Sequence, residues 1–218
     1  MPPVPVQVVG VTDLVVVGTS GNDQILFNPG SKPGEVVAKL NGLIVSRFVP
    51  TGKLVAYGGA GNDDIQVAES INLMAWLYGE TGNDRLNAGN GGSLLIGGDD
   101  NDQLIGGGGR DVMIGGNGAD NLIGNANDDI LVAGFTLKDD RASAGHVQFW
   151  SSVLAEWNSS NVFSKRVQNL KTAGGLMPQV VDDCFGDEID FLNGGAGDDW
   201  VIFAVGEDRV VGKAEAAN

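Results

Sequence analysis

The feature that most constrains this chain is a run of six nine-residue repeats, which covers Gly79–Val132 without an insertion. Each repeat approximates the pattern Gly-Gly-x-Gly-x-Asp-x-U-x, in which U is a large apolar residue. The sixth position holds, in turn, Asp84, Ser93, Asp102, Asp111, Asp120 and Asp129. The eighth position holds Leu86, Leu95, Leu104, Met113, Leu122 and Leu131. A short fixed period of this kind predicts a solenoid, in which each repeat stacks on its neighbours along one axis.

The pattern divides each repeat into a turn and a short strand. Glycines in the turn allow positive φ angles and let neighbouring backbones approach closely. The last three positions form a strand whose central residue alone points to one face, so the apolar eighth position faces inward. Two repeats make one coil of strand, turn, strand and turn. The sequence therefore predicts an all-β solenoid, a right-handed parallel β-helix or β-roll with a narrow core of Leu, Ile, Val and Met.

The same pattern continues less regularly on both sides of the run. Upstream units begin at Gly18 and Gly58, and downstream units in the same frame begin at Phe185, Gly194 and Phe203. Their sixth positions hold Asp23, Asp63, Asp190, Asp199 and Asp208. Strands are also expected at residues 35–40, 43–48 and 53–57. The starts at 18, 58 and 79 are 40 and 21 residues apart, close to multiples of one coil, so we expect irregular coils there rather than a separate domain.

A segment without the pattern separates Val132 from the downstream units. Its apolar residues recur at the spacing of two helices, and those residues are Val147, Trp150, Leu154 and Trp157, then Phe163, Val167 and Leu170. Residues that can cap the second helix are Ser159, Ser160 and Asn161. We expect a helical hairpin whose apolar stripe packs on the solenoid. The predicted plan is irregular coils in 1–57, a regular roll in 58–134, a helical insertion in 135–180, further coils in 181–212 and a tail in 213–218.

The charge of the chain points to cations as partners. It has 28 Asp and Glu against 13 Lys and Arg, a net charge of -15. Such a field disfavours nucleic acid phosphates and anionic membranes and attracts cations. Calcium accepts six to eight oxygen ligands in irregular geometry, whereas magnesium demands a near-octahedral site. Zinc prefers His or Cys, and the chain has only His146 and Cys184.

Turns on one side of the solenoid are two repeats apart, so the sixth-position residues should form rows. Asp84, Asp102 and Asp120, joined by Asp63, are expected on one flank, and Ser93, Asp111 and Asp129 on the other. Asp190 and Asp208 form a third candidate pair, with Asp199 opposite. We expect calcium between adjacent turns of a row, on the order of five to eight ions. The candidate metal-ligating residues are Asp23, Gly58, Gly59, Gly61, Asp63, Gly79, Gly82, Asp84, Gly97, Asp99, Asp102, Gly106, Gly107, Gly109, Asp111, Gly115, Gly118, Asp120, Asp129, Asp190, Gly197, Asp199 and Asp208.

The run of repeats resembles the hemolysin-type calcium-binding repeat, or RTX, family, most closely in the unit Gly115–Ile123. The last third, with a helical pair around residues 154–158 before the unit at Gly194, resembles C-terminal regions of large bacterial surface proteins. The resemblance implies a calcium-loaded parallel β-roll outside the cell, as part of a larger secreted or cell-surface protein. No stretch of the sequence approaches the length of a membrane span, so we expect no membrane insertion.

Three residues depart from the family pattern. Ser93 replaces a carboxylate, so a calcium site between its turn and that of Asp111 is expected to be weak or absent. Asp100 and Asn127 replace the fourth-position glycine, and because Asp and Asn tolerate left-handed conformations, we expect those turns to survive.

Other functions have less support in the sequence. No nucleophile triad, phosphate-binding loop or metalloprotease helix occurs, so we expect no catalytic activity. The alternative to a structural domain is a calcium-dependent adhesion module that binds a cell-surface glycan or protein. The four tryptophans are expected to be packing residues. The carboxylates of residues 182–183 and 187–188 are either extra calcium ligands or a solvated loop. Residues 1–5 lack the charged and apolar regions of a secretory signal peptide.

Overall fold

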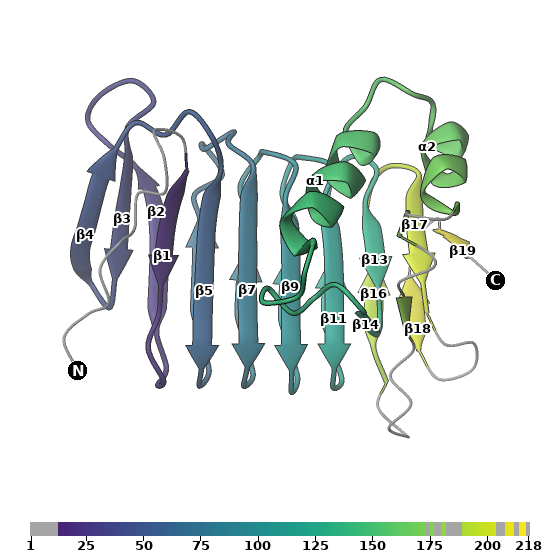
Figure 1. The fold of residues 1–218 in the computed structure, drawn as a ribbon, viewed down its shortest axis with the longest axis horizontal. Helices are drawn as coiled ribbons and strands as arrows, with labels where there is room; N and C mark the ends of the chain where they lie inside the picture. Colours follow the sequence, from purple (N-terminus) through teal and green to yellow (C-terminus); the bar gives the residue numbers. More distant parts are fainter. Residues whose placement is uncertain are drawn as a thin grey trace.

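The protein is a solenoid-like all-β fold built from two facing sheets (Figure 1). The computed structural model describes residues 13–172, 175–176, 180–181, 189–203, 208–211 and 214–216. Within these residues the first sheet has eight strands, in the order β1 (Leu14–Val17), β5 (Leu54–Ala60), β7 (Ala75–Thr81), β9 (Leu94–Asp99), β11 (Val112–Asn117), β13 (Ile130–Val132), β17 (Asp199–Ile202) and β19 (Ala214–Ala216).

The second sheet has nine described strands. Its order is β18 (Arg209–Val211), β16 (Phe191–Asn193), β12 (Asn121–Ile123), β10 (Gln103–Ile105), β8 (Arg85–Asn87), β6 (Asp64–Val67), β2 (Gln24–Pro29), β3 (Val36–Leu40) and β4 (Leu43–Phe48). Consecutive strands of the regular repeats fall alternately in the two sheets, so each sheet receives every second repeat. Two further strands, β14 (Phe135–Thr136) and β15 (Val180–Val181), pair with each other in antiparallel fashion.

The register confirms that two repeats make one coil. Leu104 lies opposite Leu86 and Leu122 in parallel strands, and Met113 lies opposite Leu95 and Leu131. The eighth-position residues of the six regular repeats are fully buried. They belong to one apolar cluster that continues from Leu14 to Val201. The predicted narrow core of Leu, Ile, Val and Met therefore lies between the sheets.

The N-terminal part differs from the coils that the sequence predicts. Ile25 lies directly opposite Ile65, so the 40 residues between these two units form one coil rather than two. The additional residues form β3 and β4, which add to β2 as an antiparallel hairpin. The strands themselves were expected, but the spacing of units gives no information on whether an added strand continues the coil or folds back beside it.

Two helices cover the outer face of the first sheet in its C-terminal half (Figure 1). They are α1 (His146–Trp157) and α2 (Phe163–Leu170). Trp150, Val153, Leu154 and Trp157 pack with Trp76, Leu94, Val112 and Ile130 in a second apolar cluster outside the sheet. This confirms the predicted helical hairpin and its packing on the solenoid. The tryptophans at 76, 150, 157 and 200 are all buried.

Two details of the helices differ from the prediction. Val147 is 51% exposed, and the buried stripe instead includes His146 and Val153. The second helix is capped by the backbone of Val162 and not by a side chain. Asn161 lies one residue before the N-cap position, and its side-chain amide donates to Glu156 at 2.9 Å. Among the described residues, neither helix is long and apolar enough to cross a membrane.

Candidate metal centre

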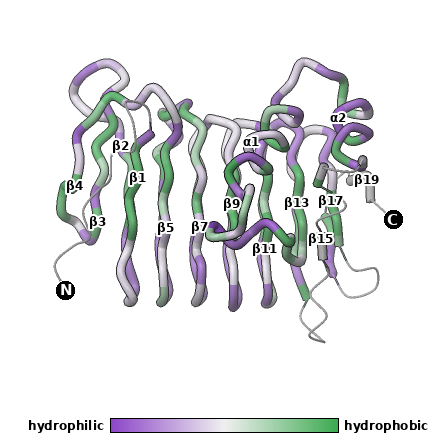
Figure 2. Tube along the Cα trace, viewed as in Figure 1, coloured by the Kyte–Doolittle hydropathy of each residue, from purple (hydrophilic) through white to green (hydrophobic). Residues whose placement is uncertain are grey.

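The sixth-position residues form two buried rows, one at each edge of the solenoid. The first row lies where the chain passes from the first sheet to the second, at the lower edge of Figure 1, and the corresponding turns in Figure 2 are white to purple. Its members are Asp23, Asp63, Asp84, Asp102, Asp120, Asp190 and Asp208. The second row is Ser93, Asp111, Asp129 and Asp199. No member from Asp23 to Asp199 is more than 4% exposed.

A ladder of hydrogen bonds holds each row in register. In every step, Oδ1 of one aspartate accepts the backbone N–H of the sixth-position residue in the preceding coil. Asp84 N–H, for example, donates to Asp102 Oδ1 at 2.8 Å, across 18 residues. The ladder orients each carboxyl group along the solenoid axis. Oδ1 bonds to the preceding coil, and Oδ2 takes no part in the ladder.

The other oxygen, Oδ2, points at the first glycine of its own repeat. A Cβ atom on Gly79 would clash with Oδ2 of Asp84 and with the carbonyl oxygen of Gly97 in the next coil. The same arrangement recurs at Gly58, Gly97, Gly106, Gly115 and Gly124. Within the described part of the chain, Oδ2 of Asp63, Asp84, Asp102 and Asp129 is buried and accepts no hydrogen bond. Carboxylate and carbonyl oxygens that converge without donors are the ligands that a hard cation such as calcium prefers.

Backbone carbonyls must supply much of any coordination here. In the described residues, no three Asp, Glu, His or Cys side chains gather around one point. The remaining candidate glycines bring the turns of adjacent coils together, because a Cβ on each would meet backbone of the preceding coil. These are Gly59, Gly61, Gly82, Gly107, Gly109, Gly118 and Gly197. The donor set is therefore oxygen only, which fits calcium and does not fit zinc.

Burial raises the pKa of the stacked carboxyl groups. The pKa is about 6 for Asp63, about 7 for Asp84 and about 9 for Asp102 in the first row. In the second row it is about 7 for Asp111 and about 9 for Asp129. Neighbouring carboxylates add to the rise for Asp63, Asp84, Asp102 and Asp129, while backbone hydrogen bonds oppose it. Without a ligand, Asp102 and Asp129 thus hold protons at neutral pH, and a divalent cation would take the place of those protons.

The N-terminal end of the first row is closed by protein donors. Asp23 Oδ1 accepts the side-chain amide of Asn41 at 2.6 Å, and Oδ2 accepts the Thr19 hydroxyl at 2.9 Å. Asn41 lies in the turn between β3 and β4 with a φ of 51°. The antiparallel hairpin therefore caps the ladder. Asp23 satisfies both carboxylate oxygens without a metal and differs in this from Asp63, Asp84 and Asp102.

The first step of the second row differs from the others. Ser93 donates its hydroxyl to the Gly91 carbonyl at 2.8 Å, and Asp111 Oδ2 accepts the Gly107 N–H at 2.8 Å. The second and fourth residues of most described turns have positive φ, and the exceptions are Thr19 and Gly21, Gly89 and Gly91, and Gly107 and Gly109. Both oxygens of Asp111 are thus hydrogen-bonded within the protein, as are both oxygens of Asp23.

Two predicted features have a different place in the structure, and a third is found as expected. Asp190 and Asp208 are not a separate pair: they continue the first row after Asp120, and Asp199 continues the second after Asp129. Asp99 lies outside both rows, where its carboxylate accepts the side-chain amide of Asn117 at 2.8 Å. Asp100 and Asn127 adopt φ angles of 75° and 72°, as expected from their tolerance of left-handed backbone. The acidic residues 182–183 and 187–188, and Cys184, lie outside the described residues.

A second ladder, of asparagines, was not predicted. The fifth-position residues of the first row are Asn22, Asn62, Asn83 and Asn101. Each side-chain oxygen accepts the backbone N–H of the fifth-position residue in the next coil, at 2.7–3.1 Å. The signal was visible in the sequence as an asparagine at the fifth position of alternate repeats. This ladder needs no cation and fixes the first row from its solvent side.

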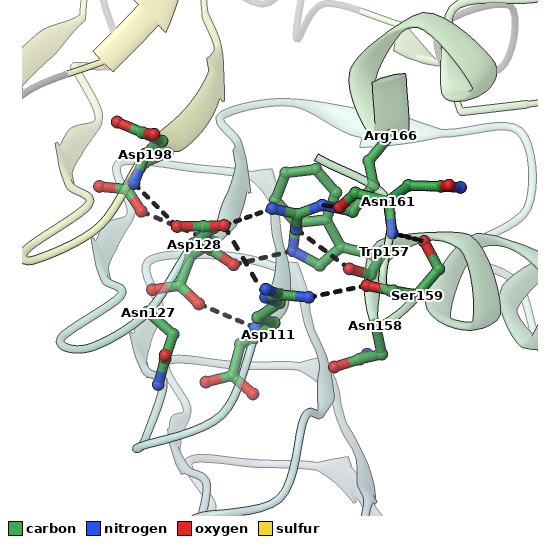
Figure 3. A network of polar contacts seen from close by, with 12 residues as sticks. Asp111, Asn127, Asp128, Trp157, Asn158, Ser159, Asn161, Arg166 and Asp198 are labelled. Atoms are coloured by element: carbon green, nitrogen blue, oxygen red, sulfur yellow. Dashed lines mark hydrogen bonds and ion pairs between the residues drawn. The ribbon is translucent and has the colours of Figure 1, made fainter. Parts of the chain in front are cut away.

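After Gly92, the fifth positions of the second row are charged, with Arg110, Asp128 and Asp198, and the helical hairpin contacts Arg110 and Asp128 (Figure 3). Asp128 forms ion pairs with Arg166 of α2 and, at 3.8 Å, with Arg110, and its Oδ1 accepts the Asp198 N–H at 2.9 Å. Trp157 donates its indole N–H to the Asp128 carbonyl at 2.9 Å. These contacts lower the pKa of Asp128 against the opposing effect of its burial. The hairpin therefore clamps the turns at residues 110 and 128, and Asp128 links them to the turn at residue 198.

Comparison with known proteins agrees with this geometry. The family described as RTX calcium-binding nonapeptide repeat (4 copies) matches residues 55–67, 78–113, 105–135 and 186–210. These segments contain the sixth-position aspartates from Asp63 to Asp208. No curated protein and no solved structure matched the chain. RTX repeats bind calcium, and the resemblance noted in the sequence is confirmed: this chain carries RTX calcium-binding repeats across residues 55–210.

Proposed function

We propose that the chain is a calcium-dependent structural domain of a secreted or cell-surface protein, in which ions between stacked turns fold and stiffen the solenoid. The observation that carries this proposal is the set of buried Oδ2 atoms of Asp63, Asp84, Asp102 and Asp129. They accept no hydrogen bond in the described structure and share their surroundings with glycine carbonyls of the next coil. A buried charged oxygen without a partner is costly, and a calcium ion removes that cost.

The same geometry explains why the domain would depend on calcium. Carboxylates of one row recur once per coil, at roughly the 4.8 Å spacing of adjacent strands, so they repel each other when ionised. A ligand that binds only the folded state stabilises it by mass action. Eight steps of the two ladders join two aspartates, which supports five to eight ions.

Two finer features belong to this proposal. We expect right-handed winding, because strand connections to a parallel neighbour are right-handed in nearly all proteins. We also expect the domain to work outside the cell, where calcium is abundant, and to remain largely unfolded in the calcium-poor cytosol. The fraction of the chain in glycine-rich turns supports this, because ordering glycine has a high entropic cost.

The experiment uses the substitution Asp102→Asn. The amide keeps an oxygen that can accept the Asp84 N–H but removes the charge. Without calcium, at neutral pH, the variant should be more stable than the parent, because the raised pKa of Asp102 obliges the parent to take up a proton when it folds. With saturating calcium it should be less stable, because a ligand is lost, by about 1–3 kcal/mol.

The control is Glu69→Gln, which removes the same charge from an exposed position. Its unfolding free energy should be within about 0.5 kcal/mol of the parent under both conditions. Urea unfolding with and without calcium measures both variants. A loss of stability in Asp102→Asn that is equal with and without calcium would refute the metal role of this carboxylate.

A further inference from the structure

A cavity of about 480 Å³ lies outside the solenoid core, next to the first-row turns that contain Gly97, Gly98 and Gly116. It is bounded by the ends of β7, β9 and β11 on one side and by residues 135–141 on the other. In Figure 1 this crossing segment, residues 135–141, passes in front of the first sheet before it enters α1. The volume lies in the range of small-molecule sites, roughly 300–1,000 Å³.

The register of the three strands builds the floor of the cavity. Tyr78 lies opposite Ile96 and forms its apolar part. Two residues further along the strands, Glu80 lies opposite Gly98, and Gly98 lies opposite Gly116. Two of these three positions therefore carry no side chain. The next step places Thr81, Asp99 and Asn117 side by side. The two glycines therefore leave a space between the apolar pair of Tyr78 and Ile96 and the polar set of Thr81, Asp99 and Asn117.

The wall opposite is fixed by hydrogen bonds. The Lys138 carbonyl accepts the Trp150 indole N–H at 3.1 Å and lies 2.5 Å from His146 Nδ1. The other nitrogen of His146 lies 2.9 Å from the Tyr78 hydroxyl on the floor. The Asp139 carboxylate accepts the Thr136 hydroxyl at 2.7 Å and shapes the turn of the crossing segment. The cavity is preformed, which lowers the entropic cost of binding.

The lining of the cavity already stabilises one cation, the guanidinium group of Arg141. Arg141 forms an ion pair with Glu80 at 2.9 Å, and its guanidinium lies 4.3 Å from the Tyr57 ring centre. Tyr57 stacks on Tyr78 with ring centres 4.9 Å apart. Glu80 has a φ of 82°, at a position where the next two coils have glycine. A strained acidic residue is more often found at functional sites than elsewhere.

Negative charge at the cavity exceeds what Arg141 neutralises. Asp99 and Asp140 also line the cavity. Asp99 accepts only the Asn117 amide, and in the part of the chain that the structure describes neither carboxylate forms an ion pair with a basic side chain. Phe135 and Tyr78 add aromatic faces. Carboxylates beside aromatic rings recognise organic ammonium groups through charge and cation–π attraction.

We propose that this cavity binds a primary ammonium group on an apolar stem, with the ammonium at Asp99 and the stem against Ile96 and Phe135. A free diamine and a lysine side chain of a polypeptide share this chemistry. A bare calcium ion fits poorly, because it requires six to eight oxygens and gains nothing from the apolar floor. Because Gly97 and Gly98 also belong to the turn of Asp102, this binding is tested with the rows saturated by calcium.

The test is calorimetric titration of the full chain in saturating calcium. The probes are 1,5-diaminopentane, Nα-acetyl-lysine amide and, as a neutral control, pentanol. Both amines, or one of them, should bind, and pentanol should not. Stronger binding of the diamine assigns the small-molecule source, and stronger binding of the lysine amide assigns the side-chain source. Absence of binding by both amines would overturn the proposal.

Variants localise the binding. Asp99→Asn should weaken amine binding about tenfold, as expected when a charge-assisted hydrogen bond is lost. Asn117→Ala, which releases the Asp99 carboxylate from its amide donor, tests the same site by a second route and should change the affinity. Glu69→Gln, exposed and distant in sequence from the cavity lining, should leave it unchanged. An equal affinity in Asp99→Asn and Glu69→Gln would overturn the assignment of the ammonium to Asp99.

Discussion

At the residue scale, the sixth-position aspartates other than Asp23 and Asp111 have two distinct roles. Oδ1 accepts a backbone N–H from the preceding coil, as in the 2.8 Å bond from Asp84 to Asp102, and contributes to the fold with or without a metal. Oδ2 faces glycine backbone and carbonyl oxygens and favours a cation. A substitution to alanine removes both roles, whereas asparagine retains the first. This separation makes the aspartate rows informative to mutate.

The two rows predict different responses to alanine. Asp102→Ala and Asp111→Ala should each lower the unfolding free energy in calcium by about 1–3 kcal/mol, because a buried N–H loses its acceptor. Asp102→Ala should lower the calcium-dependent part more, since Asp111 Oδ2 is already hydrogen-bonded to Gly107. Ser93→Ala should have little effect on calcium dependence. Urea unfolding at several calcium concentrations measures these differences, and equal effects from all three variants would contradict the row assignment.

The raised pKa values predict the pH dependence of the calcium-free chain. An unfolded Asp has a pKa of about 3.9, whereas Asp63, Asp84 and Asp102 have values of about 6, about 7 and about 9 when folded. The folded state therefore keeps protons that the unfolded state releases. Stability from these groups is full at low pH and is lost as pH rises through 6–9.

Circular dichroism of calcium-free protein between pH 9 and pH 5 measures this effect. The content of β-structure should increase as the pH falls, until other carboxylates titrate. In saturating calcium the trend should reverse, because calcium competes with protons for the same oxygens. A calcium-free β-signal that is constant or that increases toward pH 9 would contradict the burial of ionisable carboxylates in the rows.

At the element scale, the sequence predicts the features that repeat. It does not predict how one segment pairs with or packs against another. A period of nine residues determines which side chains face inward, so the Leu86–Leu104–Leu122 step follows from spacing alone. The hairpin of β3 and β4 does not follow, because strand patterns do not specify a pairing partner. Val147 has helical spacing but is exposed, because the orientation of α1 depends on the sheet beneath it. Asp99 fits the pattern of a ligand, yet its position places it on the outer face.

The helical hairpin acts as a clamp, because it forms polar contacts with turns of the second row. Arg166 is 1% exposed, donates to the Trp157 carbonyl at 3.1 Å and pairs with Asp128. Asp128 in turn links two coils through the Asp198 N–H. The first row has an asparagine ladder in the corresponding positions, which suggests that the clamp replaces the ladder that the second row lacks.

Removal of the clamp should loosen the hairpin. Arg166→Gln should destabilise α1 and α2 by about 2–4 kcal/mol, because buried donors and a carboxylate lose their partner. Hydrogen exchange should increase in both helices and in the turn around Asp128, and less in β5 and β7. Lys165→Gln, an exposed change on the same helix, is the control. Exchange rates that are equal in the two variants would show that Arg166 does not hold the hairpin.

At the scale of the whole molecule, the solenoid has a thin apolar core and long rows of buried carboxylates. The chain carries a net charge of -15, and glycine makes up 35 of its 218 residues, so ordering entropy and like-charge repulsion both oppose folding. The asparagine ladder, the β3–β4 cap and the helical clamp offset part of this cost. The remainder is the contribution that we assign to calcium.

Thermal unfolding with and without calcium tests this account most directly. Circular dichroism and calorimetry should record a cooperative β-sheet transition in millimolar calcium, with a melting temperature that rises with calcium concentration as linkage requires. After chelation of calcium, most of the β-structure should be absent at 25 °C. Full β-structure together with an unchanged melting temperature in excess chelator would contradict the claim that calcium holds this fold together.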